Sequence, residues 1–162
     1  MVLTIREASD TDHEAIWRIF HEVVSAGDTY PYAPDTTREQ ALALWFPAGA
    51  WTFVAELDGA VVATYLMKAN QPGQGRHVAN CGYMVARAAS GLGIGEALCR
   101  HSLDEAGRLG FRAMQFNFVV STNTRAVTLW KRCGFSIVGT VPQAFRHPAL
   151  GFVDAYVMHR FL

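Results

Sequence analysis

Alternating glycines open an otherwise regular helical pattern in the stretch SGLGIGEAL, residues 90–98. Glycine is unfavourable inside a helix, so Gly91, Gly93 and Gly95 indicate that something approaches the backbone closely there. A strand, a glycine loop and a helix in succession point free backbone N–H groups and the positive end of a helix dipole at one place. A phosphate group suits that place. Close packing of the helix against the strand is the other explanation of the same glycines.

The residues after this loop disfavour two common phosphate ligands. A nucleoside triphosphate loop ends in Gly-Lys-Ser/Thr, whereas Glu96 and Ala97 follow Gly95 here. A dinucleotide fingerprint needs glycine in place of Glu96 and a carboxylate at the end of the next strand, where residues 119–121 read Val-Val-Ser. Neither triphosphate hydrolysis nor NAD binding is therefore expected.

The amino-acid composition and charge favour some classes of binding partner over others. The 162 residues are 51% hydrophobic and 17% charged, with zero formal net charge, which fits a single domain over residues 1–162. No run of like charges offers a surface to nucleic acid or to an anionic membrane, so a small-molecule partner is favoured. Cys81, Cys99 and Cys133 lack the spacing of a metal site or a disulfide framework. With no signal peptide and no apolar membrane span in the sequence, we expect a cytoplasmic protein without a metal ion.

Three blocks of the chain together resemble the GNAT superfamily of acetyl-CoA-dependent N-acetyltransferases. The family's central motif, Arg/Gln-x-x-Gly-x-Gly/Ala, is similar to residues 90–95, which follow the strand sequence CGYMV. Residues 123–135, NTRAVTLWKRCGF, are similar to its Asn-x-x-Ala-x-x-Leu-Tyr-x-x-x-Gly-Phe block. Residues 154–158, DAYVM, match its Asp-x-x-x-Met ending. The blocks occur in family order and span nearly the whole chain.

The resemblance implies a mixed α/β fold, in which a twisted and mostly antiparallel sheet has splayed parallel strands 4 and 5 and flanking helices. The loop amides would hold the pyrophosphate of CoA, and its pantetheine arm would lie between the splayed strands. The residues implied at acetyl-CoA are Met84, Val85, Arg87, Ser90, Gly91, Leu92, Gly93, Ile94, Gly95, Asn123 and Trp130.

Two positions depart from the family pattern. Ser90 stands where the family usually has Arg or Gln, so Arg87 would supply the positive charge. Trp130 replaces the Tyr that often protonates the CoA thiolate, and an indole donates a hydrogen bond without acting as an acid. Another donor or water would then supply that proton.

The resemblance also implies direct attack of a neutral amine on the thioester. A backbone N–H of Tyr83 or Met84 would polarise the thioester carbonyl. Residues 78–86 contain no carboxylate, so we expect the amine to lose its proton through water.

Asn80 and Asn117 interrupt apolar strand sequences, which predicts buried amides in need of partners. A structural link between strands is one explanation. A polar pair that orients the carboxylate or amine of a substrate is the other. With Asn123, they resemble an asparagine set in a GNAT subgroup that acetylates proline analogues and small cyclic amino acids. Asn123 also has a structural explanation as a helix cap.

The loop over residues 27–34 would cover the acceptor in this family. Its Thr29, Tyr30 and Tyr32 are candidate acceptor contacts, and surface aromatic packing is the alternative. Residues 145–154 would close the other side, where Arg146 or His147 offers a cation unless both are simply solvated.

The sequence thus predicts an N-acetyltransferase that acts on a small amine, an amino acid or a proline-like analogue. A phosphinothricin-type detoxifying acetyltransferase and a non-catalytic CoA-binding sensor are the alternatives. The apolar C-terminal strands allow a homodimer.

The elements that must position these residues follow from periodicity and turn signals. Ser9, Asp10 or Asp12 would cap the first helix, Gly27 would end it, and Asp58-Gly59 predicts a hairpin. We expect strands over 2–6, 51–69 (the hairpin), 77–86, 111–120, 135–141 and 152–162, and helices over 13–26, 36–46, 92–109 and 123–133.

Overall fold

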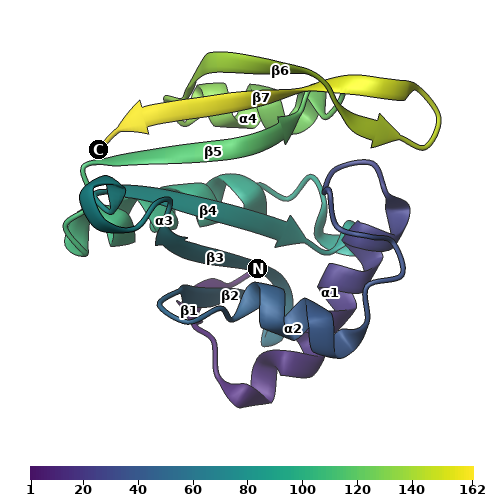
Figure 1. The fold of residues 1–162 in the computed structure, drawn as a ribbon. Coiled ribbons are helices and arrows are strands. Elements are labelled where there is room, and N and C mark those ends of the chain that lie inside the picture. Colours follow the sequence, from purple (N-terminus) through teal and green to yellow (C-terminus); the bar gives the residue numbers. More distant parts are fainter.

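A single seven-stranded sheet organises the computed structural model, which describes residues 1–162. Its order is β1-β2-β3-β4-β5-β7-β6, as Figure 1 shows. The strands are β1 (Leu3–Glu7), β2 (Trp51–Leu57), β3 (Ala60–Ala69), β4 (Val78–Val85), β5 (Ala113–Val120), β6 (Ser136–His147) and β7 (Gly151–Phe161). The helices are α1 (His13–Ala26), α2 (Arg38–Trp45), α3 (Ile94–Arg108) and α4 (Thr124–Arg132). No helix has the length and apolarity to span a membrane.

Helices cover both faces of the sheet, and each face has its own core. Leu98 of α3 and Trp130 of α4 belong to one buried cluster with Tyr65 of β3. Ile16 of α1 belongs to the other, with Leu66 from the opposite face of the same strand. In Figure 1, α1 and α2 lie in front of the sheet and α3 and α4 lie behind it.

The turn and cap residues in the sequence predicted most helices and strands correctly. The hairpin prediction is confirmed, because Asp58 (φ 50°) and Gly59 (φ 86°) both adopt the left-handed conformation that joins β2 to β3. Gly27 ends α1 with a φ of 72°, also as expected. The third helix begins at Ile94 rather than at Leu92, because the left-handed Gly93 lies between the loop and the helix.

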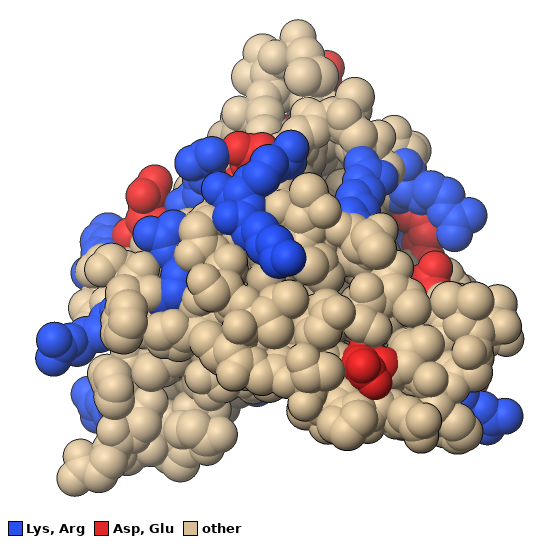
Figure 2. Space-filling model, turned by 90° about the horizontal axis from the view of Figure 1, so that it is seen from above, with Lys and Arg blue, Asp and Glu red and all other residues tan.

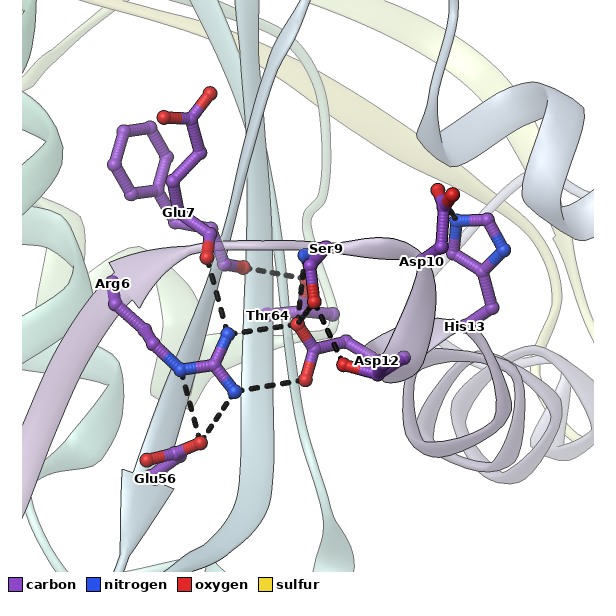
Figure 3. Close-up of polar contacts among 10 residues, drawn as sticks. Arg6, Glu7, Ser9, Asp10, Asp12, His13, Glu56 and Thr64 are labelled. Atoms are coloured by element: carbon purple, nitrogen blue, oxygen red, sulfur yellow. Dashed lines mark hydrogen bonds and ion pairs between the residues drawn. The ribbon is translucent and has the colours of Figure 1, made fainter.

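The start of α1 differs from the simple cap that the sequence predicts. Ser9 caps a short 3₁₀ turn, Asp10–Asp12, and Asp12 makes no side-chain cap to α1. The Asp12 carboxylate instead accepts from Arg6 Nη1 at 2.8 Å and from the Ser9 N–H at 2.8 Å (Figure 3). Arg6 Nε also donates to Glu56 Oε1 at 3.0 Å. Arg6 therefore ties β1 and β2 to the start of α1.

The parallel strands β4 and β5 diverge soon after they begin. They pair only at Val78↔Ala113 and Ala79↔Met114, whereas β3 stays paired with β4 as far as Val85 (Figure 1). The mixed sheet with splayed parallel central strands is thereby confirmed. Beyond Ala79, one edge of β4 has lost its neighbouring strand.

Candidate active site

A cavity of about 920 Å³ follows the line along which β4 and β5 diverge. The loop before α2, the loop before α3, the start of α4 and both diverging strands contribute its walls. Sequence-predicted residues that line it are Thr29, Tyr30, Asn80, Tyr83, Met84, Val85, Ser90, Gly91, Gly93, Ile94, Gly95, Asn117, Asn123 and Trp130. Arg87 and Leu92 do not line it.

At one end of the cavity, the glycine loop presents unused donors. Gly91 and Gly93 have φ angles of +87° and +78°, a conformation that other residues rarely adopt. The backbone N–H groups of residues 91–93 donate no hydrogen bond within the protein, and the first turn of α3 adds donors that no helical carbonyl can take. This end can therefore bind an anion.

Gly95 has a different reason to be glycine. A Cβ there would lie 3.2 Å from Leu129 Cδ2, so its absence lets α3 and α4 pack closely. Gly95 is thus a glycine for packing, although against a helix and not against the strand that the sequence suggested, whereas Gly91 and Gly93 are glycines for conformational reasons.

The cation at the loop is Arg125, which sequence reasoning missed. Its Nη1 donates to Ser90 Oγ at 2.7 Å, and its side chain lines the cavity. Arg87 is exposed, and its backbone N–H donates to a carboxylate oxygen of Glu22 at 2.8 Å. The signal for Arg125 was its place two residues after Asn123, at the start of the helix that abuts the loop.

Midway along the cavity, the open edge of β4 faces the gap. Met84 pairs with Thr64 of β3, in a register where Ala86 N–H bonds to Val62 and Asn70 N–H bonds to Val78. Backbone groups of alternate residues point to opposite neighbours. Of the two candidate N–H groups, that of Tyr83 therefore faces the gap, and that of Met84 faces β3.

The Tyr83 N–H already has a partner. It donates to the hydroxyl of Tyr30 at 2.9 Å, and the same hydroxyl donates to the Tyr83 carbonyl at 2.7 Å. Burial raises the pKa of Tyr30, so its hydroxyl keeps the proton that it donates.

The asparagines have separate roles in the structure. Asn80 Nδ2 donates to the Gln115 carbonyl at 3.0 Å, which is the structural link between strands at the point where they separate. Asn117 is exposed, so the expectation of a buried amide was wrong. It lines the cavity, and its Nδ2 donates to Asn70 Oδ1 at 2.7 Å. Asn123 caps α4 by accepting from the Ala126 N–H at 3.3 Å.

An aromatic wall lies where the family Tyr would stand. The Trp130 ring contacts the rings of Tyr83 and Phe116, each with a centroid distance of 4.9 Å. The Tyr83 hydroxyl is 2.7 Å from Ser102 Oγ, and burial raises the pKa of this tyrosine well above the usual value. Burial also raises the pKa of the Cys81 thiol to about 12. None of these groups is an acid near neutral pH.

At the other end of the cavity, aromatic rings and one lysine contribute to the wall. Tyr30 stacks on Tyr32 at 5.7 Å and meets Trp45 edge-on at 6.4 Å. Lys68, which sequence reasoning missed, lines the cavity opposite Asn80 in the β3–β4 register and forms no ion pair. Its signal was a lone lysine at the end of an apolar strand.

The cations that the sequence suggested for this end lie elsewhere. Arg146 and His147 do not line the cavity. The His147 ring nitrogen instead accepts from the N–H groups of Ala149 and Leu150 in the β6–β7 turn.

Residues 14–135 match the Acetyltransferase (GNAT) family. The chain belongs to this family. N-acetyltransferase aca1 of Schizosaccharomyces pombe is 30% identical over 151 residues, which cover 83% of this chain and 72% of the relative. The protein is therefore an N-acetyltransferase with the GNAT fold.

Solved GNAT structures agree with this assignment. A GCN5-related N-acetyltransferase from Kribbella flavida superimposes with a TM-score of 0.94 at 53% identity, over 99% of this chain and 98% of that chain. A phosphinothricin acetyltransferase from Sinorhizobium meliloti, solved in complex with acetyl-CoA, gives 0.84 at 25% identity over 100% of this chain and 89% of that chain.

Proposed function

We propose that this GNAT enzyme transfers an acetyl group from acetyl-CoA to the amine of a small molecule that carries a carboxylate, an amino acid or a proline-like analogue. The observation that carries the proposal is the composition of one continuous cavity. Unused backbone donors lie at one end, the open β4 edge lies in the middle, and a lone cation lies at the other end. The only carboxylate that lines it, Glu96, is ion-paired with Arg100 and Arg132.

The loop end fits the pyrophosphate of acetyl-CoA. Backbone N–H groups of residues 91–93, the first turn of α3 and the Arg125 guanidinium would hold its charge, with Ser90 positioned by Arg125. Met84 and Val85 would border the pantetheine arm along the open edge of β4, and Asn123 and Trp130 would border it from α4. Acetyl-CoA bound there supplies an activated acyl carbon as its thioester.

The middle of the cavity would promote the transfer. The amine nitrogen forms a bond to the carbonyl carbon, the carbon–sulfur bond breaks, and the electron pair leaves with sulfur. The Tyr83 N–H would donate to the carbonyl oxygen as negative charge develops on it. The amine proton passes to water, because the cavity has no free carboxylate to accept it.

The charge of the acceptor end favours an acidic amine. Lys68 is the cation there, and the neighbouring amides of Asn80 and Asn117 can bond to a carboxylate or to an amine. Thr29 and the ring of Tyr30 would contact the apolar part of the acceptor. A polyamine or an aminoglycoside would bring several positive charges to Lys68 with no acid to offset them.

The first test is the release of free CoA thiol from acetyl-CoA across amino acids, proline analogues, phosphinothricin, polyamines and aminoglycosides. We expect turnover with a carboxylate-bearing amine and none with the polycations. Lys68→Glu should raise the KM for that acceptor about tenfold, the size of one lost ion-pair contribution combined with a new repulsion. The matched control is Lys131→Glu, which changes the only other lysine, on α4 outside the cavity. Turnover of polyamines by the wild-type enzyme would contradict the acceptor class.

Two alternative functions are each supported by a single observation. A phosphinothricin substrate is supported by the Sinorhizobium meliloti relative, and competition between phosphinothricin and the amino acids in the same assay separates the two. A non-catalytic CoA-binding role is supported by Trp130 in place of an acid. Saturable acetyl-CoA binding without thiol release for any amine would favour that role.

We also infer that a second copy of the chain covers β6 and β7. β6 is an edge strand, and Val138, Val141 and Phe152 of the hairpin are exposed by 61%, 45% and 66%. Figure 2, which views this side from above, shows charged side chains over its upper part and edges and a lower part almost without them. An uncharged apolar surface beside an unpaired strand edge suits self-association.

A further inference from the structure

Tyr30 comes from the loop over residues 27–34, here called the acceptor loop, yet its hydroxyl lies in the middle of the cavity, at the open edge of β4. It bridges the N–H and the carbonyl of Tyr83 at 2.9 and 2.7 Å, on the edge of β4 that β5 has left. These are the backbone bonds that a neighbouring strand would otherwise make. The Tyr30 hydroxyl therefore makes the two hydrogen bonds to Tyr83 that a paired strand would make.

The surroundings hold the Tyr30 ring in this place. Tyr32 stacks on one side with an interplanar angle of 12°, and Trp45 meets its edge. Gly82 of β4 lies directly beside both side chains, since a Cβ there would be in van der Waals contact with the Tyr30 hydroxyl at 3.4 Å and with Trp45 Cη2 at 3.5 Å. The contact is thus built by three separate elements: the acceptor loop, α2 and β4.

The Tyr83 N–H cannot serve two strong acceptors. A backbone N–H has one hydrogen to donate, and hydrogen bonds weaken steeply when the angle departs from linearity. The proposed function assigns this hydrogen to the thioester oxygen. In the structure, the Tyr30 hydroxyl holds it.

We propose that the Tyr30 hydroxyl covers the Tyr83 N–H in the middle of the cavity and that the thioester of acetyl-CoA displaces it from Tyr83. This inference rests on the proposed function. Displacement couples the middle of the cavity to its acceptor end, because moving the hydroxyl shifts the same loop, residues 27–34, that contributes Thr29 and Tyr32 to the acceptor end. Tyr30 is a positioning residue that acts through Tyr83.

The test compares the affinities of acetyl-CoA and free CoA for the wild-type enzyme and for Tyr30→Phe, by isothermal titration calorimetry. The variant keeps the stacked ring and removes only the hydroxyl. Acetyl-CoA should then bind about fivefold more tightly, the equilibrium effect of about one ordinary hydrogen bond. Free CoA has no thioester carbonyl, so its Kd should stay unchanged. Tyr156→Phe, which removes a tyrosine hydroxyl outside the cavity, is the matched control, and both of its Kd values should equal those of the wild type.

A second measurement follows the Tyr83 amide directly by NMR. Its resonance should move on Tyr30→Phe substitution and on addition of acetyl-CoA to the wild type, and should stay in place with free CoA. An unchanged ratio of the CoA and acetyl-CoA Kd values in Tyr30→Phe would overturn the inference. So would a weaker affinity for acetyl-CoA alone, since the hydroxyl would then help to hold the thioester. A wild-type protein that binds neither ligand would overturn the proposed function itself.

Discussion

Arg125 is the side chain on which the charge of the glycine loop depends. Its guanidinium bonds to Ser90 at 2.7 Å and borders the unused backbone donors, whereas the Arg87 side chain is exposed outside the cavity. Arg125→Gln should raise the Kd for acetyl-CoA about tenfold, as expected for loss of a charge-assisted hydrogen bond to phosphate. Arg87→Gln should leave it within about twofold. The measurement is direct titration of acetyl-CoA into each purified variant.

A larger loss of acetyl-CoA affinity in Arg87→Gln than in Arg125→Gln would contradict the assignment to Arg125. It would support the sequence-based assignment to Arg87. The structure favours Arg125 over Arg87 for a physical reason. Chain proximity puts Arg87 three residues before Ser90, but its backbone N–H is held by Glu22 and its side chain lies outside the cavity. Arg125 is distant in sequence and reaches the loop because α4 packs against α3 across the gap left by Gly95.

At the scale of single elements, the sequence predicted the turns and helix ends that depend only on neighbouring residues. The left-handed residues Asp58, Gly59 and Gly27 mark a hairpin and a helix end in any fold, and both were predictable. The exposure of Asn117 was not predictable, because it depends on the pleat of β5 near the register shift between Phe116 and Val119. The Tyr30–Tyr83 contact also lay beyond sequence, because it joins residues whose approach depends on the splay of two strands.

The Arg6–Asp12 pair makes the junction of β1, β2 and α1 sensitive to acid. Hydrogen bonds from Arg6 (Figure 3) lower the pKa of the Asp12 carboxyl from 3.8 to about 2, and the Asp12 side chain is only 5% exposed. A lowered folded-state pKa means that the ionised form stabilises the fold above about pH 4 and that this contribution is lost as the pH falls toward 2. It amounts to about 2 kcal/mol.

Urea unfolding at a series of pH values tests this sign. Asp12→Asn should be about 2 kcal/mol less stable than the wild type at pH 7, and the difference should shrink as the pH falls from 4 toward 2. The exposed Asp35→Asn, which removes no hydrogen bond or ion pair, is the control and should follow the wild type throughout. A difference that stayed constant with pH would mean that Asp12 stabilises the turn by packing alone.

At the scale of the whole molecule, the two cores and the open sheet edge have different consequences. Clusters on both faces pack against the central strands, and β4 and β5 diverge between these clusters beyond Ala79. The edge at β6 is different, since nothing in one chain covers its apolar residues. The sequence could indicate apolar strands there, but only the strand order shows which of them is the edge.

Self-association through this edge predicts a particle of about twice the 17.8 kDa chain mass in size-exclusion chromatography with light scattering. Val138→Asp combined with Phe152→Asp should give a monomer, because two charges cannot be buried in an apolar contact without partners. Both residues lie outside the cavity, so the affinity for acetyl-CoA should stay unchanged. A wild-type monomer at micromolar concentration would contradict the dimer. A double variant that stays dimeric would place the interface on another surface.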